Sequence, residues 1–203
     1  EEFKAFNKKY YIPNNAVLVV AGDIDVPAVK KMVEDYFGPI PRGEDIVRNF
    51  PKEDPITEPM REKAYDANIQ IPAILAAYRT PSFKDRDAYV LSMISTYLSD
   101  GKTSKLYKKM VDDKKMALQV GAFDYSQEDY GTYIIFGLPQ GETNLDDLVV
   151  EIDEEILKIQ NELISERDFQ KIQNKLENSF VNSNSSIQGV ANSLARYYML
   201  YGD

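Results

Sequence analysis

The sequence predicts an α+β fold, a two-layer sandwich in which helices cover one face of a mainly antiparallel sheet. Apolar and polar residues alternate over residues 116–125 and again over residues 130–138, which is the period of β-strands. Gln127-Glu128-Asp129 lies between the two runs and indicates the turn of an antiparallel hairpin. In other segments apolar residues recur at helical spacing. Runs of helices that are separated from runs of strands are typical of this fold class.

The N-terminal part of the chain predicts one strand followed by one helix. Residues 15–23 are almost continuously apolar and end in a Gly-Asp turn signal, so we expect a buried central strand there. Asp25 as the N-cap and Pro27 in the first turn begin a helix, which Gly38-Pro39 ends. A buried strand needs neighbours on both sides, and the preceding residues cannot supply them. We therefore interpret residues 1–43 as the strand–helix remnant of a truncated domain.

A linker and a second domain are expected to follow. Residues 44–57 belong to a proline-rich stretch with mixed charges and little periodicity, which favours an extended interdomain linker. Residues 58–203 then read as strand, two helices, two strands and three helices. The first strand is expected over residues 69–79, with Pro72 at its start, at a bulge or at a sheet edge. The helical pair after it has apolar faces around residues 90–98 and 106–111.

Three helices are predicted after the hairpin. The longest runs from residue 144 or 145 to about residue 163 and is expected to bury Leu148, Val149, Ile152, Ile156, Ile159 and Leu163. Ser165-Glu166-Arg167-Asp168 resembles a capping box, with Asp in place of the usual Glu or Gln, and begins the next helix. The last helix is expected from about Ile187.

The composition excludes several classes of function. Among 203 residues there are 33 Asp and Glu against 24 Lys and Arg, so a nucleic-acid partner is not expected. No apolar run reaches the roughly 20 residues that a membrane-spanning helix needs. The chain has no Cys and no His. These absences exclude disulfides, thiolate nucleophiles, Ser-His-Asp sites and His- or Cys-ligated metals within it, but they do not decide the compartment.

Three features together resemble the M16 (pitrilysin and insulinase) family of zinc peptidases. Residues 6–25 are similar to the family's Phe-x-x-x-Tyr-Tyr-x-Pro-Asn-Asn-Ala-x-Leu-x-x-x-Gly-Asp stretch near the end of its first domain. Residues 101–111, followed by Ala117, are similar to its Gly-x-x-Ser-Arg-Leu-Tyr-x-x-Leu-Val segment. The order of elements over residues 58–203 matches the family's second domain. The resemblance implies the M16 (LuxS-like) fold and covers almost the whole chain.

The family resemblance implies a scaffold role for this chain. Members hydrolyse peptides with zinc held by an inverted His-x-x-Glu-His motif and a later Glu, whose positions would all lie before Glu1. We therefore expect no catalytic and no metal-binding residue here, with substrate-binding residues unknown and zinc a cofactor of the parent protein only. Residues 58–203 would be an inactive domain whose sheet forms a wall of a two-halved chamber that encloses an unfolded peptide. The partner would be the other M16 half, in the same chain, a second copy or a different protein.

The resemblance also suggests which half this chain comes from. The family's substrate-holding Arg and Tyr, found opposite the zinc, would fall at Val111 and Leu118, so neither side chain is present. That departure favours the zinc-bearing half as the parent. A non-catalytic structural or assembly subunit of the same family is the alternative hypothesis, and a generic α+β binding module is a third. Bacterial family members suggest a periplasmic location.

Other polar clusters are interpreted as ordinary surface. We expect the lysine pairs to lie on solvated helix faces and the acidic runs to lie on outer helix faces without converging, rather than to form anion or metal sites: Lys30-Lys31, Lys108-Lys109, Lys114-Lys115, Asp112-Asp113 and Asp153-Glu154-Glu155. Tyr78-Arg79-Thr80 is expected to pack at a strand end rather than to contact substrate. Arg196-Tyr197 lies in the wrong element for the family's Arg and Tyr. The glycosylation patterns at Asn182 and Asn184 are attributed to chance.

Overall fold

The computed structural model describes residues 1–202, which form two compact units. One unit comprises residues 56–176, and the other comprises residues 1–55 together with the chain from Glu177 onward. Each unit is described by itself below. The expected division into family domains at residues 1–43, 44–57 and 58–203 stays a prediction.

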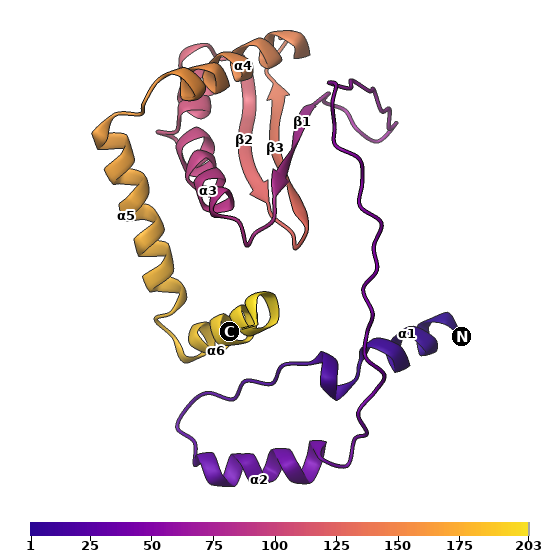
Figure 1. The fold of residues 1–203 in the computed structure, drawn as a ribbon. Coiled ribbons are helices and arrows are strands. Elements are labelled where there is room, and N and C mark those ends of the chain that lie inside the picture. Colours follow the sequence, from indigo (N-terminus) through magenta and orange to yellow (C-terminus); the bar gives the residue numbers. More distant parts are fainter. Residues whose placement is uncertain (203) are drawn as a thin grey trace. The chain divides into compact units, whose positions relative to one another are not determined.

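Residues 56–176 are built on a three-stranded antiparallel sheet (Figure 1). The strands are β1 (Ile74–Pro81), β2 (Ala117–Tyr125) and β3 (Tyr130–Pro139), and β3 lies in the centre between β1 and β2. The predicted hairpin is confirmed as β2 and β3, which pair with Ala122 opposite Ile135. The first strand begins at Ile74 rather than at residue 69, because Pro72 has no N–H to contribute to a ladder.

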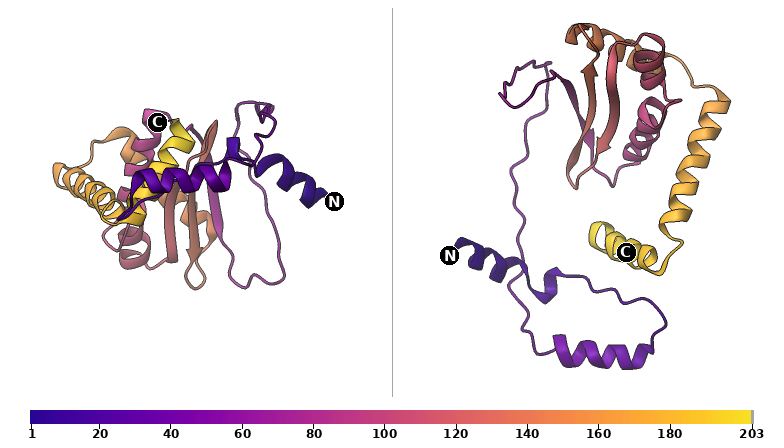
Figure 2. Two further views of the ribbon diagram at one scale, coloured as in Figure 1. Left: turned by 90° about the horizontal axis from the view of Figure 1, so that it is seen from below. Right: turned by 180° about the vertical axis from the view of Figure 1, so that it is seen from behind.

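Helices cover one face of this sheet, which confirms the predicted α+β sandwich (Figure 2). They are α3 (Arg86–Ser99), the short helix η2 (Tyr107–Asp113), α4 (Leu145–Asn161) and the first part of α5 (Glu166–Ser183). Side chains cap three of them: Asp85, Asn144 and Ser165 each accept a backbone N–H of the first turn. The element order is the one predicted from the sequence.

The second helix of the predicted pair differs from expectation in its winding. Residues of η2 form a π-helix rather than an α-helix, and the N–H of Lys114 donates to the carbonyl of Lys109, five residues earlier. After it, Lys115 has a φ of 50°, a left-handed conformation that is rare for a residue with a side chain.

The core lies between the sheet and the helices. Its fully buried side chains are Leu98, Leu106, Met110, Ile135, Leu148 and Ile152. Leu148 and Ile152 were both predicted from the spacing of the long helix. The prediction for Leu163 was wrong: α4 ends at Asn161, so Leu163 lies beyond the helix and is fully exposed.

The other unit contains α1 (Glu2–Tyr10), the 3₁₀ turn η1 (Pro13–Asn15), α2 (Val26–Phe37) and α6 (Ile187–Tyr201). Helix α2 begins as predicted, with the N–H of Ala28 donating to Asp25 at 2.8 Å. The expected buried strand over residues 15–23 is not formed: these residues are extended, mostly exposed and unpaired. The reason is that no described strand offers its backbone groups to this run. Within residues 1–202, no helix is both long and apolar enough to cross a membrane.

Candidate functional site

Within residues 56–176, one face of the sheet carries no helix of that unit, and we call it the bare face. The pairing of Ala77 with Ile134 and of Phe123 with Ile134 places alternate residues of all three strands on this face. Its main side chains are Leu75, Arg79, Phe123, Tyr125, Ile134 and Phe136. Leu75 is 66% exposed and Phe123 is 43% exposed. A contiguous apolar surface of this kind is typical of a binding face rather than of plain solvated surface.

Two phenylalanines and a glycine make a fixed aromatic platform on the bare face. The ring of Phe136 lies over Gly121, where a Cβ atom would come within 2.4 Å of it. Phe123 contacts the same ring edge-on, with the ring centroids 6.4 Å apart. Because Gly121 has no side chain, the Phe136 ring can pack closely against the strand at this position. We call these three residues the aromatic platform.

Arg79 is the only charged residue that the strand register places on the bare face of the described sheet. Its guanidinium lies 4.5 Å from the ring centroid of Tyr130, which is a cation–π geometry. Tyr78 and Thr80 point to the opposite face, towards the helices. Thr80 is buried and donates to Asp124 at 3.4 Å. Burial raises the pKa of Tyr78, and the charge of Asp153 adds to this rise. Of the Tyr78-Arg79-Thr80 segment, only Arg79 therefore lies on the bare face.

A groove of about 500 Å³ lies on the helix-covered side, between α3, α4 and β1. Leu91 and Ile94 of α3 form one wall, and Ile156 and Ile159 of α4 form the other. The base includes Tyr133, whose pKa is raised by burial. Few polar groups converge in this groove, so it has the character of an apolar packing surface.

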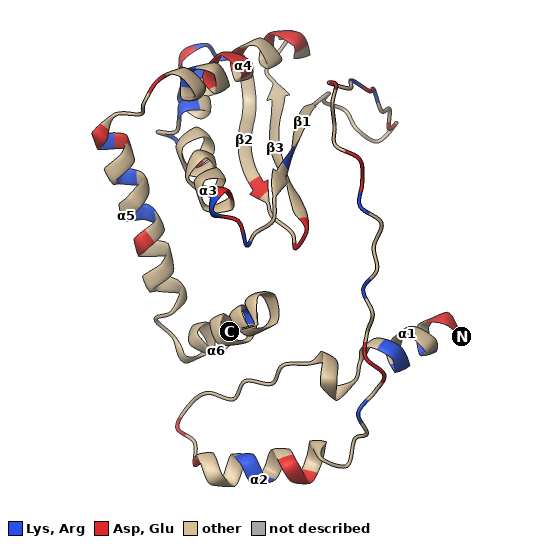
Figure 3. Cartoon of the chain, in the orientation of Figure 1, with Lys and Arg blue, Asp and Glu red and all other residues tan. Residues whose placement is uncertain are grey.

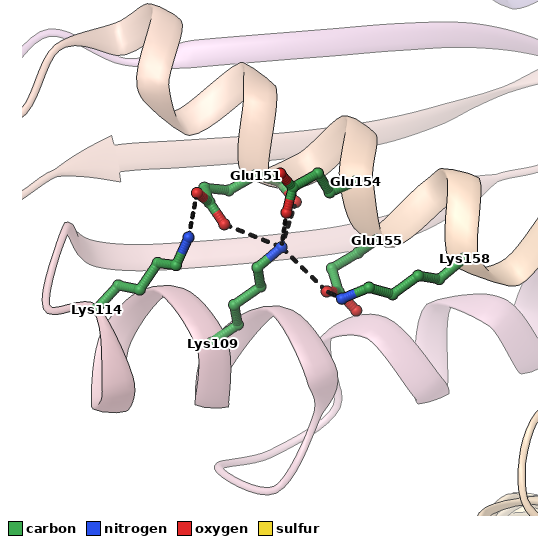
Figure 4. A network of polar contacts seen from close by, with 6 residues as sticks. All are labelled: Lys109, Lys114, Glu151, Glu154, Glu155 and Lys158. Carbon is green, nitrogen blue, oxygen red and sulfur yellow. Dashed lines mark hydrogen bonds and ion pairs between the residues drawn. The ribbon is translucent and has the colours of Figure 1, made fainter.

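Charged residues of η2 and α4 converge in a network that the sequence interpretation missed (Figure 4). The ammonium of Lys109 lies 2.9 Å from Glu151, 2.8 Å from Glu154 and 3.1 Å from Glu155. Lys114 pairs with Glu151, and Lys158 pairs with Glu155 at 2.6 Å. The expectation that Lys109 and the acidic run would be separate solvated faces was therefore wrong. Residues three and four apart lie on one side of a helix, so Glu151, Glu154 and Glu155 surround one cation.

The ion pairs shift the pKa values of the buried residues in this network. Burial of Lys109 disfavours its charge, but hydrogen bonds to Glu154, Glu151 and Glu155 outweigh burial and raise its pKa above the ordinary value. Burial alone would raise the pKa of Glu151, yet the hydrogen bonds from Lys114 and Lys109 lower it. The pKa of Glu155 is lowered in the same way by Lys158 and Lys109. The ion pairs of this network thus connect η2 to α4.

A second set of ion pairs links α5 to the segment between α3 and η2. Lys105 pairs with Asp168 at 2.9 Å, and Lys175 pairs with Asp100 at 2.5 Å. The hydrogen bond from Lys105 lowers the pKa of the Asp168 carboxyl. Asp168 therefore serves an ion pair, while Ser165 alone caps the helix by accepting from the N–H of Asp168.

The remaining residues singled out in the sequence belong to both units. Val111 is partly buried against the core, whereas Leu118 is exposed at a bulge where β2 begins. In the other unit the ring of Tyr197 lies 5.7 Å from that of Tyr201, and the side-chain amide of Asn182 donates to Asn178.

The acidic residues of the network do not form a metal site. Within residues 1–202 there is no cluster of three His, Cys, Asp or Glu side chains that could hold one. Glu151, Glu154 and Glu155 come together, but the Lys109 ammonium fills the space between them. A cation in that place would have to displace Lys109.

Comparison with known families decides the identity of the fold. The sequence model of the peptidase M16 inactive domain matches residues 1–176. The chain belongs to this family. The predicted resemblance to M16 is thereby confirmed, as is the α+β fold. Among curated relatives, the M16 chain is 23% identical over 202 residues to zinc protease PqqE of Helicobacter pylori. The alignment covers 97% of this chain and 45% of that protein.

Solved structures agree with the M16 fold. A protease from Helicobacter pylori superposes with a TM-score of 0.84 at 22% identity, covering 98% of this chain and 49% of that one. The periplasmic protease PqqL from Escherichia coli superposes with a TM-score of 0.67 at 16% identity, covering 90% of this chain and 20% of that one. The M16 chain thus spans about half the length of the curated relative and of the solved structure from Helicobacter pylori that it matches.

Proposed function

We propose that this M16 chain is part of a zinc-dependent metalloendopeptidase and supplies a wall of the chamber in which peptides are hydrolysed. The observation that carries the proposal is the match to the M16 inactive domain in a chain that contains no His. The name of the Helicobacter pylori relative, a zinc protease, supports a peptidase as the parent. The family's zinc motif would belong to the part of the parent that precedes residue 1.

The arrangement of unit 56–176 supports the wall assignment. Helices cover one face of the sheet, and the other face remains apolar and open. A chamber that accepts unfolded peptides needs such a surface, because peptide side chains of many kinds must contact it without a single deep pocket. In this proposal, residues 1–43 complete the first domain of the parent, residues 44–57 link the domains, and residues 58–203 form the second domain.

The proposed partner of this wall is another M16 half. The M16 chain spans 45% of zinc protease PqqE, so a second half within the same polypeptide is the arrangement that we favour. We also propose a periplasmic location, by analogy with PqqL of Escherichia coli. Fractionation of cells that express the intact protein would test the location, and recovery in the cytoplasmic fraction would contradict it.

The function is tested by comparing the 203-residue chain with the intact protein. We expect the chain alone to hold far less than one zinc per molecule, measured by inductively coupled plasma mass spectrometry, and to leave quenched fluorescent peptides uncleaved. The intact protein is expected to cleave these peptides, to stop after chelation and to recover when zinc is returned. Stoichiometric zinc and hydrolysis in the short chain would overturn its scaffold role. An intact protein without zinc-dependent hydrolysis would favour the structural or assembly subunit.

A further inference from the structure

We propose that the groove between α3, α4 and β1 is covered, in the intact parent, by an amphipathic helix of the same M16 inactive domain that lies outside residues 1–203. We call this groove the helix groove. The proposal rests on the family to which the chain belongs and on the polarity of the groove, and it does not require peptidase activity.

The helix groove leaves the covered face of the sheet incomplete at its β1 edge. In the centre of the sheet, Tyr133 and Ile135 of β3 are 6% and 1% exposed. Tyr78 of the edge strand β1 pairs with Tyr133 and points to the same face, yet it is 44% exposed. Val90, on the wall that α3 forms, is 41% exposed. The helices of residues 56–176 thus leave apolar surface beside β1 in contact with water.

The composition of α3 indicates that a further element covers it. After Asp87 no charged residue follows in this helix up to its end at Ser99. Figure 3 shows α3 largely tan, whereas α4 carries acidic and basic residues along its length. A helix whose outer side faces solvent carries a charged or polar face, as α4 does. Depletion of charge beside exposed aromatic and aliphatic side chains, such as Tyr89 and Val90, is typical of a surface that another element covers.

A solved structure of the family indicates where this element comes from. The inactive peptidase domain from Bordetella parapertussis superposes with a TM-score of 0.56 at 20% identity, and the match covers 63% of this chain and 67% of that one. About a third of that domain therefore lies outside the match. Because an inactive domain of this family contains elements beyond the matched ones, a segment of the same domain is favoured over an unrelated protein as the cover of the groove.

The walls of the helix groove favour a helix as the occupant. Leu91 and Ile94 of α3 lie on one wall, and Ile156 and Ile159 of α4 lie on the other. Residues three and four apart lie on one side of a helix, so a helix with large apolar residues at that spacing would contact both walls and the side chains of β1 between them. The groove has a volume of about 500 Å³, which accepts several such side chains.

Single cysteines test whether the groove is covered, since the chain contains no Cys of its own. Val90→Cys places a thiol on the groove wall, and Leu157→Cys is the matched control on α4, where Leu157 is 54% exposed and does not line the groove. The rate of maleimide labelling at each position is measured by peptide mass spectrometry in the 203-residue chain and in the intact protein. Leu91→Cys serves as a second variant if Val90→Cys does not fold by circular dichroism.

A covered thiol reacts only when its cover opens, so we expect Val90→Cys to react about ten-fold more slowly in the intact protein than in the 203-residue chain. Leu157→Cys should react at similar rates in both. Equal rates for Val90→Cys in the two proteins would overturn the proposal. Equal slowing of Val90→Cys and Leu157→Cys would overturn it as well, since the cover would not be specific to the groove.

Photo-cross-linking from the same wall identifies the occupant. With p-benzoylphenylalanine in place of Val90 in the intact protein, we expect a cross-link to a peptide of the same inactive domain outside residues 1–203, with large apolar residues three and four apart. Three results contradict this expectation: a cross-link within residues 1–203, a product that contains two copies of the protein, and a cross-link to another M16 domain or to a different protein.

The groove proposal and the proposed function fail separately. An intact protein without zinc-dependent hydrolysis would refute the peptidase function, while the labelling rates of Val90→Cys would be unaffected. Equal labelling of Val90→Cys in the short chain and in an intact protein that cleaves peptides would refute the groove proposal alone.

Discussion

The network around Lys109 allows a stability prediction that can be worked from the structure. Lys109→Met keeps the length and apolar stem of the side chain but removes the charge. Lys109 is 17% exposed, and the side chains of Glu151 and Glu155 are 12% and 9% exposed, so the variant leaves two largely buried carboxylates without their shared partner. Breaking a buried ion pair from one side costs about 3–5 kcal/mol. Lys114 and Lys158 still neutralise one carboxylate each, so we expect a loss of about 2–3 kcal/mol at neutral pH.

The loss of stability in Lys109→Met should depend on pH. Ion pairing lowers the pKa of Glu151 and Glu155, so their stabilising contribution is present above the unfolded-state pKa of about 4.3. The contribution is lost as the pH falls through the lower folded-state pKa. In Lys109→Met, Glu151 and Glu155 each lose one lysine partner, while burial still disfavours their charge. The pKa of each carboxyl is therefore higher in the variant than in the wild type, and each takes up a proton more readily. The difference between variant and wild type should therefore be largest near pH 7 and should shrink towards about pH 4.

Urea unfolding followed by circular dichroism at several pH values measures the effect. Lys108→Met is the matched control, because Lys108 is the adjacent residue and its side chain is exposed. We expect this control to change the free energy of unfolding by less than about 0.5 kcal/mol. If Lys109→Met and Lys108→Met are equally stable at pH 7, or if the loss for Lys109→Met is constant with pH, the assigned role of the network is refuted.

Three further predictions concern residues 56–176. Lys115→Gly should stabilise the chain by about 1 kcal/mol, because Lys115 has a φ of 50°, and should raise the melting temperature while Lys115→Ala does not. Asn144→Ala should cost about 1 kcal/mol in urea unfolding, because the N–H of Asp146 loses its cap at the start of α4; an unchanged midpoint would contradict this. Leu98→Ala should cost about 2–5 kcal/mol, because Leu98 is 1% exposed in the core, whereas Leu157→Ala at the surface of α4 should cost under 1 kcal/mol in the same assay.

Much of the fold could be predicted from local patterns. The hairpin of β2 and β3 followed from alternation with a turn between the runs, and α4 followed from its apolar spacing. Ser165 was found as a cap because capping depends on residues three apart in the sequence. The bare face could not have been separated from the covered face in this way. Both faces of β3 are apolar, so only the positions of α3 and α4 show which side is covered.

Two of the errors share one cause, which is that their outcome depends on distant partners. Residues 15–23 have every local property of a buried strand, but a strand forms only where another strand pairs with it. Lys109 and the acidic residues of α4 are ordinary surface residues by local criteria. They became a buried network because η2 packs beside α4.

The sequence by itself determined the order of strands and helices in residues 56–176, the caps at Asp25 and Ser165, and the absence of a His- or Cys-based metal centre within this chain. These properties depend on composition and on residues that are neighbours in the sequence, so they do not require knowledge of the packing. Only the tertiary structure decided which sheet face stays open, where Arg79 and the aromatic platform lie, and which charges meet at Lys109. Those properties depend on contacts between residues far apart in the chain, and such contacts arise from packing rather than from local preference.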